Sequence, residues 1–225
     1  MTDKPTIDLR CGDCLEVMKS MPDKSVGLSI LDPPYNIRIG ENKHYPCRLD
    51  NQDLVYWDNM PADKYAEWIK VVIEQVLRVS ECAIITPGNG NLQLYPKPLW
   101  MLCWLKMNGC TITPLTRGQK ICKCCFEPVL VYGKLDNPPQ FDVVNRPISN
   151  QAAAEGHPVP KPLDLFREFV SWKDCDTVAD FMMGSGTAGV VAKLSNHNFL
   201  GCEIDKKYFD LAKRRIDSTE WGMFE

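Results

Sequence analysis

Short apolar runs alternate with amphipathic segments along this chain, and the alternation predicts strands followed by helices. Residues 26–31 (V-G-L-S-I-L) are typical of a short buried strand, and residues 61–79 place apolar side chains at helical spacing. Such alternation indicates an α/β protein with a mostly parallel sheet covered on both faces. Strands are predicted at residues 7–10, 26–31, 82–86, 110–115, 128–132, 177–181 and 198–204, and helices at residues 15–21, 61–79, 92–107, 163–172, 188–195 and 206–216.

Composition limits the class of protein. The 225 residues, 44% apolar and 24% charged, suit one globular domain over 1–225. There is no apolar run of transmembrane length, and Met1 leads straight into polar sequence, so we expect a cytoplasmic protein. The 11 cysteines are scattered and odd in number, which favours free thiols over a disulfide framework. Their spacing lacks the paired pattern of zinc sites, so no metal is expected.

Charge is distributed unevenly. The net charge is −3, yet the stretch from Lys97 to Lys134 holds Glu127 as its single acidic residue. This basic stretch fits a surface that faces a polyanion, and it fits an ordinary solvated face equally well. Its six basic residues are Lys97, Lys106, Arg117, Lys120, Lys123 and Lys134.

The stretch Asp32-Pro33-Pro34-Tyr35 directly follows the strand predicted at 26–31. Two prolines stop both sheet and helix, because each fixes φ and lacks an N–H. A rigid carboxylate, carbonyls without local partners and a flat ring together suit a clamp for the exocyclic amine of a base. The same four residues could also be only a strand-terminating turn.

A second informative stretch is residues 180–187 (D-F-M-M-G-S-G-T), which lies between a predicted strand and a predicted helix. Its glycines permit a tight turn, and the helix that follows offers free N–H groups. Glu203 ends the next predicted strand and is well placed to accept the hydroxyls of a ribose. The pairing indicates a nucleoside-containing cofactor, and on spacing alone NAD is a rival.

Three stretches together resemble the DNA amino-methyltransferases, which transfer a methyl group from S-adenosylmethionine to adenine N6 or cytosine N4. They are residues 32–35 (D-P-P-Y), 157–162 (H-P-V-P-K-P) and 184–187 (G-S-G-T). Their order along the chain is that of the β group of this family. The resemblance covers residues 9–216 and implies a Rossmann-like methyltransferase fold, with a mostly parallel seven-stranded sheet and one antiparallel strand.

The resemblance also implies a role for each matching residue. Asp32 and the carbonyl of Pro33 would hold the target amine, and Tyr35 would stack on the base after it leaves the duplex. Pro34 completes this catalytic motif. Lys161 would lie near the methionine carboxylate of the cofactor. The cofactor site implied by the family consists of Asp13, Asp32, Lys161, Asp180, Met182, Gly184, Ser185, Gly186, Thr187 and Glu203.

The chain departs from the family pattern in its cofactor loop, where the family usually has D-P-F-x-G-S-G-T-T. Phe181 stands at the proline position, Met182 at the aromatic position and Ala188 at the second threonine, so we expect altered cofactor packing. His157 belongs to the family motif, although it could simply cap a turn. Trp57 fits a base pocket and a core anchor equally well.

The function expected from the resemblance is site-specific methylation of double-stranded DNA in a restriction-modification setting, by a protein that could be a homodimer. Asp32 favours adenine N6, because serine or threonine is more usual there in cytosine N4 enzymes. Alternatives are cytosine N4 methylation, a methyltransferase acting on RNA or protein, and a weakly active or non-enzymatic DNA-binding relative. Target recognition would lie within residues 36–59 and 116–156.

Overall fold

The structure is a computed structural model that describes residues 5–37, 58–106, 111–114, 121–148 and 160–222. Its strands are β1 (Ile7–Cys11), β2 (Val26–Leu31), β3 (Ser80–Ile85), β4 (Trp100–Leu105), β5 (Thr111–Pro114), β6 (Ile121–Cys124), β7 (Phe126–Tyr132), β8 (Val143–Asn145), β9 (Thr177–Asp180) and β10 (Asn198–Glu203). Its helices are α1 (Cys14–Lys19), α2 (Ala62–Val79), α3 (Leu163–Ser171), α4 (Thr187–Leu194), α5 (Lys206–Ser218) and the 3-10 helix η3 (Asn89–Leu94).

One central sheet organises the molecule. Within the described ranges it has eight strands in the order β1-β10-β9-β2-β3-β7-β4-β8. β7 runs antiparallel to both β3 and β4, and the other neighbouring strands pair in parallel. The prediction of a mostly parallel sheet with one antiparallel strand is therefore confirmed, with one strand more than the seven expected.

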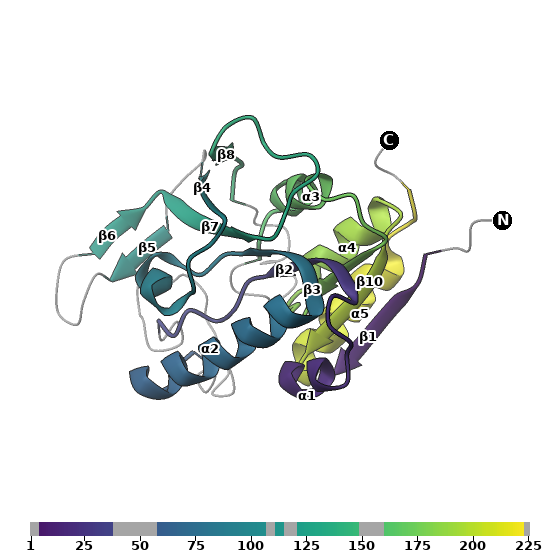
Figure 1. Cartoon of the computed structure of the whole chain (residues 1–225), viewed down its shortest axis with the longest axis horizontal. Coiled ribbons are helices and arrows are strands. Elements are labelled where there is room, and N and C mark those ends of the chain that lie inside the picture. Colours follow the sequence, from purple (N-terminus) through teal and green to yellow (C-terminus); the bar gives the residue numbers. More distant parts are fainter. Residues whose placement is uncertain (1–4, 38–57, 107–110, 115–120, 149–159, 223–225) are drawn as a thin grey trace.

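Helices cover both faces of this sheet (Figure 1). The side chains of β3 show why both faces must be covered, because they alternate between two apolar clusters. Cys82 and Ile84 enter the first cluster, and Ala83 and Ile85 enter the second. The first cluster contains the inner faces of α3, α4 and α5, and the second contains those of α1 and α2. The result is a three-layer α/β architecture, with β5 and β6 forming a separate two-stranded ribbon at the left of Figure 1. Within the described ranges, no helix combines the length and apolar character needed to cross a membrane.

The helix predicted at residues 92–107, with a break or a start at Pro96 and Pro98, is wrong. The chain instead forms the short helix η3, passes Pro96 and Pro98, and then enters β4. The prolines break any continuous helix, and the burial of Leu102 and Trp104 between more exposed neighbours follows the two-residue period of a strand. Sequence reasoning predicted neither β6 nor β8, and β8 lies in the polar, proline-rich segment 134–162, which has no clear periodicity.

Gly133 provides a test of how closely β3 and β7 approach at the end of their pairing. Its φ is +81°, and an added Cβ would lie 2.2 Å from the carbonyl oxygen of Glu81. We expect Gly133→Ala to lower the free energy of unfolding by about 2 kcal/mol, because both the φ and the contact become strained. Urea denaturation measures this change. Gly90→Ala is the matched control, since nothing lies within 4 Å of its added Cβ.

Candidate functional site

Acidic side chains gather where neighbouring parallel strands end, the edge at which open α/β sheets bind ligands. Asp13 and Asp32 follow β1 and β2, while Asp180 and Glu203 are the last residues of β9 and β10. β7 runs in the opposite direction, so its second residue, Glu127, reaches this same edge. The sheet topology thus brings together residues that are far apart in the sequence.

The two oxygens of the Asp32 carboxylate have different surroundings. Oδ1 accepts hydrogen bonds from Thr86 Oγ1 at 2.6 Å, Lys161 Nζ at 2.6 Å and Tyr35 OH at 2.8 Å. Among the described residues, none donates to Oδ2, and the side chain is 26% exposed. One oxygen therefore fixes the carboxylate, and the other is open to a ligand.

The backbone carbonyls of the Asp32–Tyr35 turn are divided in a similar way. Tyr65 OH donates to the carbonyl of Pro34 at 2.7 Å, and Asn91 Nδ2 donates to that of Tyr35 at 2.9 Å. The carbonyl of Pro33 accepts no hydrogen bond from any residue that the structure describes. The turn is held rigidly, and it keeps one backbone carbonyl oxygen, that of the buried Pro33, and one carboxylate oxygen without a described donor.

Tyr35 is fixed at both ends of its side chain. Its ring lies against Gly88, where an added Cβ would come within 2.9 Å of two ring carbons. Its hydroxyl lies 2.8 Å from Asp32 Oδ1 and 3.2 Å from Glu127 Oε2. Burial, together with these two negative charges, raises the pKa of Tyr35 well above its usual value. The hydroxyl therefore stays protonated and donates at neutral pH.

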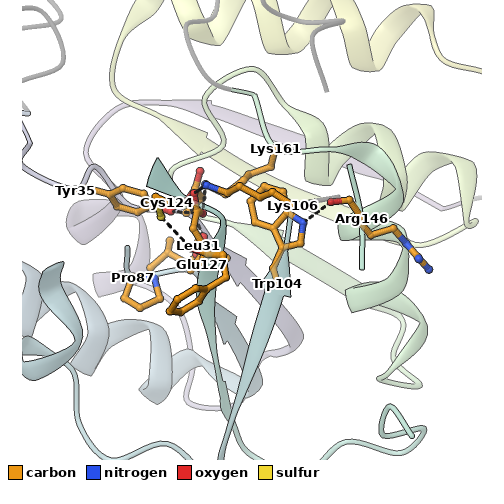
Figure 2. A network of polar contacts seen from close by, with 12 residues as sticks. Leu31, Tyr35, Pro87, Trp104, Lys106, Cys124, Glu127, Arg146 and Lys161 are labelled. Carbon is orange, nitrogen blue, oxygen red and sulfur yellow. Dashed lines mark hydrogen bonds and ion pairs between the residues drawn. The ribbon is translucent and has the colours of Figure 1, made fainter. Parts of the chain in front are cut away.

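A buried ion-pair network lies behind the turn (Figure 2). Lys161 Nζ is 2.6 Å from Asp32 Oδ1 and 3.4 Å from Glu127 Oε2, and Lys106 Nζ is 2.6 Å from Glu127 Oε1. Both ammonium groups also lie over the ring of Trp104, at 5.9 Å for Lys161 and 5.3 Å for Lys106. Two carboxylates and two ammonium groups balance one another in this network.

The pKa shifts agree with that charge balance. Burial lowers the pKa of Lys161, but Asp32 and Glu127 outweigh burial and bring it above its ordinary value. Burial raises the pKa of Glu127, but Lys161 and Lys106 outweigh burial and bring it below its ordinary value. Lys161 and Glu127 are therefore both charged across the neutral range.

The loop from Asp180 to Thr187 forms the other half of the edge. Glu203 holds it, because Oε2 accepts from the N–H of Gly184 at 2.8 Å and Oε1 accepts from that of Asp205 at 2.9 Å. Gly186 has a φ of +79°, and an added Cβ would lie 2.8 Å from the Cβ of Ala212, so a side chain there would clash with α5. The loop then leads directly into α4, which begins at Thr187.

Asp180 and Glu203 differ from Asp32 and Glu127, because no described cation pairs with either Asp180 or Glu203. Asp180 accepts only the N–H of Met182, at 3.0 Å, among the described residues. Burial raises the pKa of Asp180 well above its usual value, with help from the charges of Asp32 and Glu203. Burial also raises the pKa of Glu203, although its backbone hydrogen bonds oppose this. These carboxyls suit a ligand that brings hydroxyls or a cation.

The structure also locates the other residues predicted for the cofactor site. Asp13 caps α1 by accepting the N–H of Leu15 at 2.8 Å. Ser185 and Thr187 are buried in the loop, and Met182 is partly buried against the cluster under α1 and α2. Phe181 is 1% exposed in that same cluster, so its side chain fills the core.

The two buried lysines have contacts that sequence reasoning did not predict. The ammonium of Lys161, predicted to lie near the methionine carboxylate of the cofactor, contacts Asp32, Tyr35 and Glu127. Lys106, counted in the basic surface stretch, is 4% exposed and paired with Glu127. Lys106 is buried because it directly follows β4, which carries it into the interior beside the carboxylate of Glu127.

Sequence reasoning missed several residues that build the site: Thr86, Tyr65, Asn91, Lys106 and the bridging role of Glu127. A signal was present for two of them, since Lys106 and Glu127 are single charges that adjoin otherwise apolar strands. Thr86, Tyr65 and Asn91 show no comparable pattern. Their roles depend on how α2, β3 and η3 pack around the turn.

Some predicted residues lie outside the described ranges. They include Trp57, His157, residues 38–57 of the first segment proposed for target recognition (36–59), and residues 116–120 and 149–156 of the second (116–156). Asp58 is described, and its Oδ1 accepts the N–H of Ile37 at 3.1 Å. The described residues contain no cluster of three or more His, Cys, Asp or Glu side chains that could hold a metal ion.

Comparison with known proteins assigns the class of protein. The model of the N6_N4_Mtase family, described as DNA methylase, matches residues 93–214. This match covers more than half of the chain and includes Glu127, Lys161, Asp180 and Glu203. The chain therefore belongs to the DNA methylase family, as the three sequence motifs predicted.

Individual relatives extend the similarity over most of the chain. The chain is 25% identical to the type II methyltransferase M.HinfI of Haemophilus influenzae, over 91% of this chain and 67% of the relative. It is 24% identical to the type II methyltransferase M2.DpnII of Streptococcus pneumoniae, over 92% of this chain and 88% of that relative. These two similarities run through both the clamp and the cofactor loop.

Solved structures share the fold. The cytosine-N4-specific PvuII DNA methyltransferase superposes with a TM-score of 0.65 and 17% identity, over 95% of this chain and 89% of that one. M1.HpyAVI in complex with SAM gives a TM-score of 0.59 and 21% identity, over 94% of this chain and 100% of that one. The α/β architecture derived above is therefore that of known methyltransferase structures.

The unpaired carboxyl of Asp180 leads to a prediction about stability. A raised pKa means that the folded state binds this proton more tightly, so the wild-type protein loses stability as pH rises above about 4. We expect Asp180→Asn to raise the free energy of unfolding by about 1 kcal/mol or more at pH 8. The gain should shrink toward pH 4.5. Urea denaturation at both pH values measures it.

The control for this prediction is Asp142→Asn, which changes an exposed carboxylate. It should alter the free energy of unfolding by less than about 0.5 kcal/mol at either pH. A gain for Asp180→Asn that is the same at pH 4.5 and pH 8 would contradict the assigned pKa direction.

Proposed function

We propose that this protein transfers a methyl group from S-adenosylmethionine to the exocyclic amine of a base in DNA, and that the base is adenine, modified at N6. The observation that carries the proposal is a pair of acceptors without a described donor on one rigid turn, Asp32 Oδ2 and the carbonyl oxygen of Pro33. An exocyclic amine has two N–H groups, and this turn offers one acceptor for each of them.

The geometry of the turn explains how it would activate the amine. When both N–H groups are engaged in hydrogen bonds, the nitrogen lone pair is directed away from the turn. The clamp supplies orientation and polarisation, and no covalent bond between enzyme and base is needed. A base can reach the turn only outside the duplex, so the target nucleotide must flip out, at a cost of a few kcal/mol.

The residues on the adjoining strand ends fit the cofactor. Asp180 is a buried carboxyl without a described cationic partner, which suits the ammonium of a methionine group. Each oxygen of Glu203 uses one hydrogen bond for the loop and keeps a lone pair for the hydroxyls of a ribose. Ser185, Thr187 and the N-terminus of α4 complete this half of the site. When bound, the cofactor supplies an electrophilic methyl group.

The choice of substrate rests on the family and on Asp32. M.HinfI and M2.DpnII are named as type II methyltransferases, which supports DNA as the substrate of this chain and a restriction-modification setting. Asp32 favours adenine N6 by the family tendency given above. Cytosine N4 is the second candidate, because the PvuII enzyme, which shares this fold, is specific for that position.

The function can be tested directly. The protein is incubated with isotopically labelled S-adenosylmethionine and unmethylated double-stranded DNA, and modified positions are read by sequencing. We expect label on adenine N6 within a defined sequence context. Label on cytosine N4 would support methyl transfer to DNA and would identify cytosine, in place of adenine, as the target base. The absence of label in DNA would overturn the proposal.

Asp32→Asn tests the clamp itself. The variant keeps the shape of the side chain but removes the charge that polarises the amine and pairs with Lys161. We expect kcat for methyl transfer to fall at least about 100-fold. Cofactor binding, measured by calorimetry, should persist. Full activity in this variant would contradict the mechanism.

Tyr65→Phe tests whether the backbone of the turn must be held. Loss of the hydroxyl leaves the Pro34 carbonyl without this donor and loosens the neighbouring acceptor at Pro33. We expect kcat to fall about 10-fold, because the clamp depends on orientation. Tyr132→Phe is the matched control, since its hydroxyl donates to the carbonyl of Pro96 at 2.8 Å, outside the turn. Equal effects of the two variants on kcat would contradict a specific role for Tyr65.

A further inference from the structure

Four charged side chains form an alternating chain that begins in the interior and ends at the clamp: Lys106, Glu127, Lys161 and Asp32. Successive contacts measure 2.6, 3.4 and 2.6 Å. The side chains of Lys106, Glu127 and Lys161 are 1%, 10% and 6% exposed, whereas that of Asp32 is 26% exposed. Asp32 is thus the only member of this chain with substantial access to a ligand.

Glu127 contacts two groups that also contact Asp32, the ammonium of Lys161 and the hydroxyl of Tyr35. Its Oε2 lies 3.4 Å from Lys161 Nζ and 3.2 Å from Tyr35 OH. These same two groups lie 2.6 and 2.8 Å from Asp32 Oδ1 and 2.9 Å from each other. Lys161 and Tyr35 therefore both bridge the two carboxylates. The Tyr35 hydroxyl has one proton and favours Asp32 at the shorter distance, so the ammonium is the bridge that can donate to both carboxylates at once.

The charge of Glu127 also makes the two lysines compatible. Lys106 and Lys161 approach the same Trp104 ring, and Glu127 accepts from both of them. Without a negative charge at Glu127, Lys161 would lose one of the two carboxylates that hold it in place, and Lys106 would lose its ion pair with Glu127. Buried charges that lose a partner tend to move or neutralise. The Asp32 carboxylate would then lose its fixed orientation.

We propose that Glu127 is a positioning residue for methyl transfer, which acts through Lys161 and Tyr35 to hold Asp32 with Oδ1 saturated and Oδ2 facing the amine. Lys106 is its counter-ion and keeps the Glu127 carboxylate charged. This inference rests on the proposed function, because it assigns Glu127 a part in the same clamp. It makes an interior ion pair necessary for catalysis as well as for folding.

The kinetic test is Glu127→Gln, which preserves size and removes the charge. We expect kcat to fall about 10- to 100-fold, while the dissociation constant for S-adenosylmethionine stays within about twofold. Asp136→Asn is the matched control, because it removes a carboxylate that lies 2.8 Å from Lys173 outside the site. Its kcat should equal that of the wild type. Wild-type kcat in folded Glu127→Gln would overturn the proposal.

The pH profile separates positioning from a general loss of fold. The charged or titratable groups around Lys161 come from four elements. The turn contributes Asp32 and Tyr35, β7 contributes Glu127, and the residue after β4 is Lys106. Asp180, at the end of β9, interacts with the charge of Asp32. Removal of the Glu127 charge takes away one anion that keeps Lys161 protonated. The alkaline limb of the kcat profile should therefore move to lower pH in Glu127→Gln. An unshifted limb would count against the proposal.

A double variant addresses the structural explanation. Lys106→Met combined with Glu127→Gln removes both charges of the inner pair and leaves Lys161 balanced by Asp32. Neutral replacement of a buried pair is often tolerated by the fold. We expect the melting temperature to return close to that of the wild type while kcat stays low. Recovery of kcat together with stability would show that Glu127 serves only folding, and would overturn the proposal.

A crystallographic comparison of the wild type and Glu127→Gln decides the positioning step without activity. In the variant we expect Lys161 Nζ to leave Asp32 Oδ1 and the Asp32 carboxylate to rotate. An unchanged Lys161–Asp32 contact would overturn the proposal even if kcat fell. If the wild type methylates no DNA, the proposed function fails, and the catalytic role of Glu127 fails with it. The crystal structures would still decide whether Glu127 orients Asp32.

Discussion

A buried ammonium group must be surrounded by acceptors, and the clamp half of this site is built around that requirement. Lys161 comes just before α3, and its partners come from the turn after β2 and from the start of β7. Because an unpaired charge in the interior is strongly destabilising, these three segments can only pack together with the ion pairs formed. The position of Asp32 is therefore a consequence of how the interior is neutralised.

The two halves of the ligand-binding edge differ in their electrostatics. In the clamp half, two carboxylates and two ammonium groups balance, and the Asp32–Tyr35 turn is held by side chains from α2, from the residue directly after β3 and from η3. In the cofactor half, Asp180 and Glu203 accept backbone N–H groups, and no described lysine or arginine pairs with them. The first half is rigid and neutral, as a positioning device requires. The second retains unsatisfied acceptor capacity, as a binding site for a polar, cationic cofactor requires.

The reversed strand β7 connects this chemistry to the topology. A parallel strand in its place would put its first residues at the opposite edge, and Glu127 would then be far from Asp32. Because β7 is antiparallel to β3 and β4, the beginning of β7 and the end of β4 lie together. Glu127 and Lys106 can therefore meet behind the clamp. The one antiparallel strand of the described central sheet is thus directly tied to the network that supports the site.

Local sequence determined much of this protein: the α/β alternation, the turn at Asp32–Tyr35, the glycine loop before α4, and the family. These follow from signals that act over a few residues, such as side-chain period, proline and glycine, and motif order. Only the tertiary structure decided that residues 100–105 form a strand, that Lys106 is buried, and that Lys161 and Glu127 support Asp32. Those outcomes depend on which strands become neighbours and on the need to neutralise charge between them. The sequence marks Lys106 and Glu127 only as single charges beside apolar strands and does not show which groups they meet.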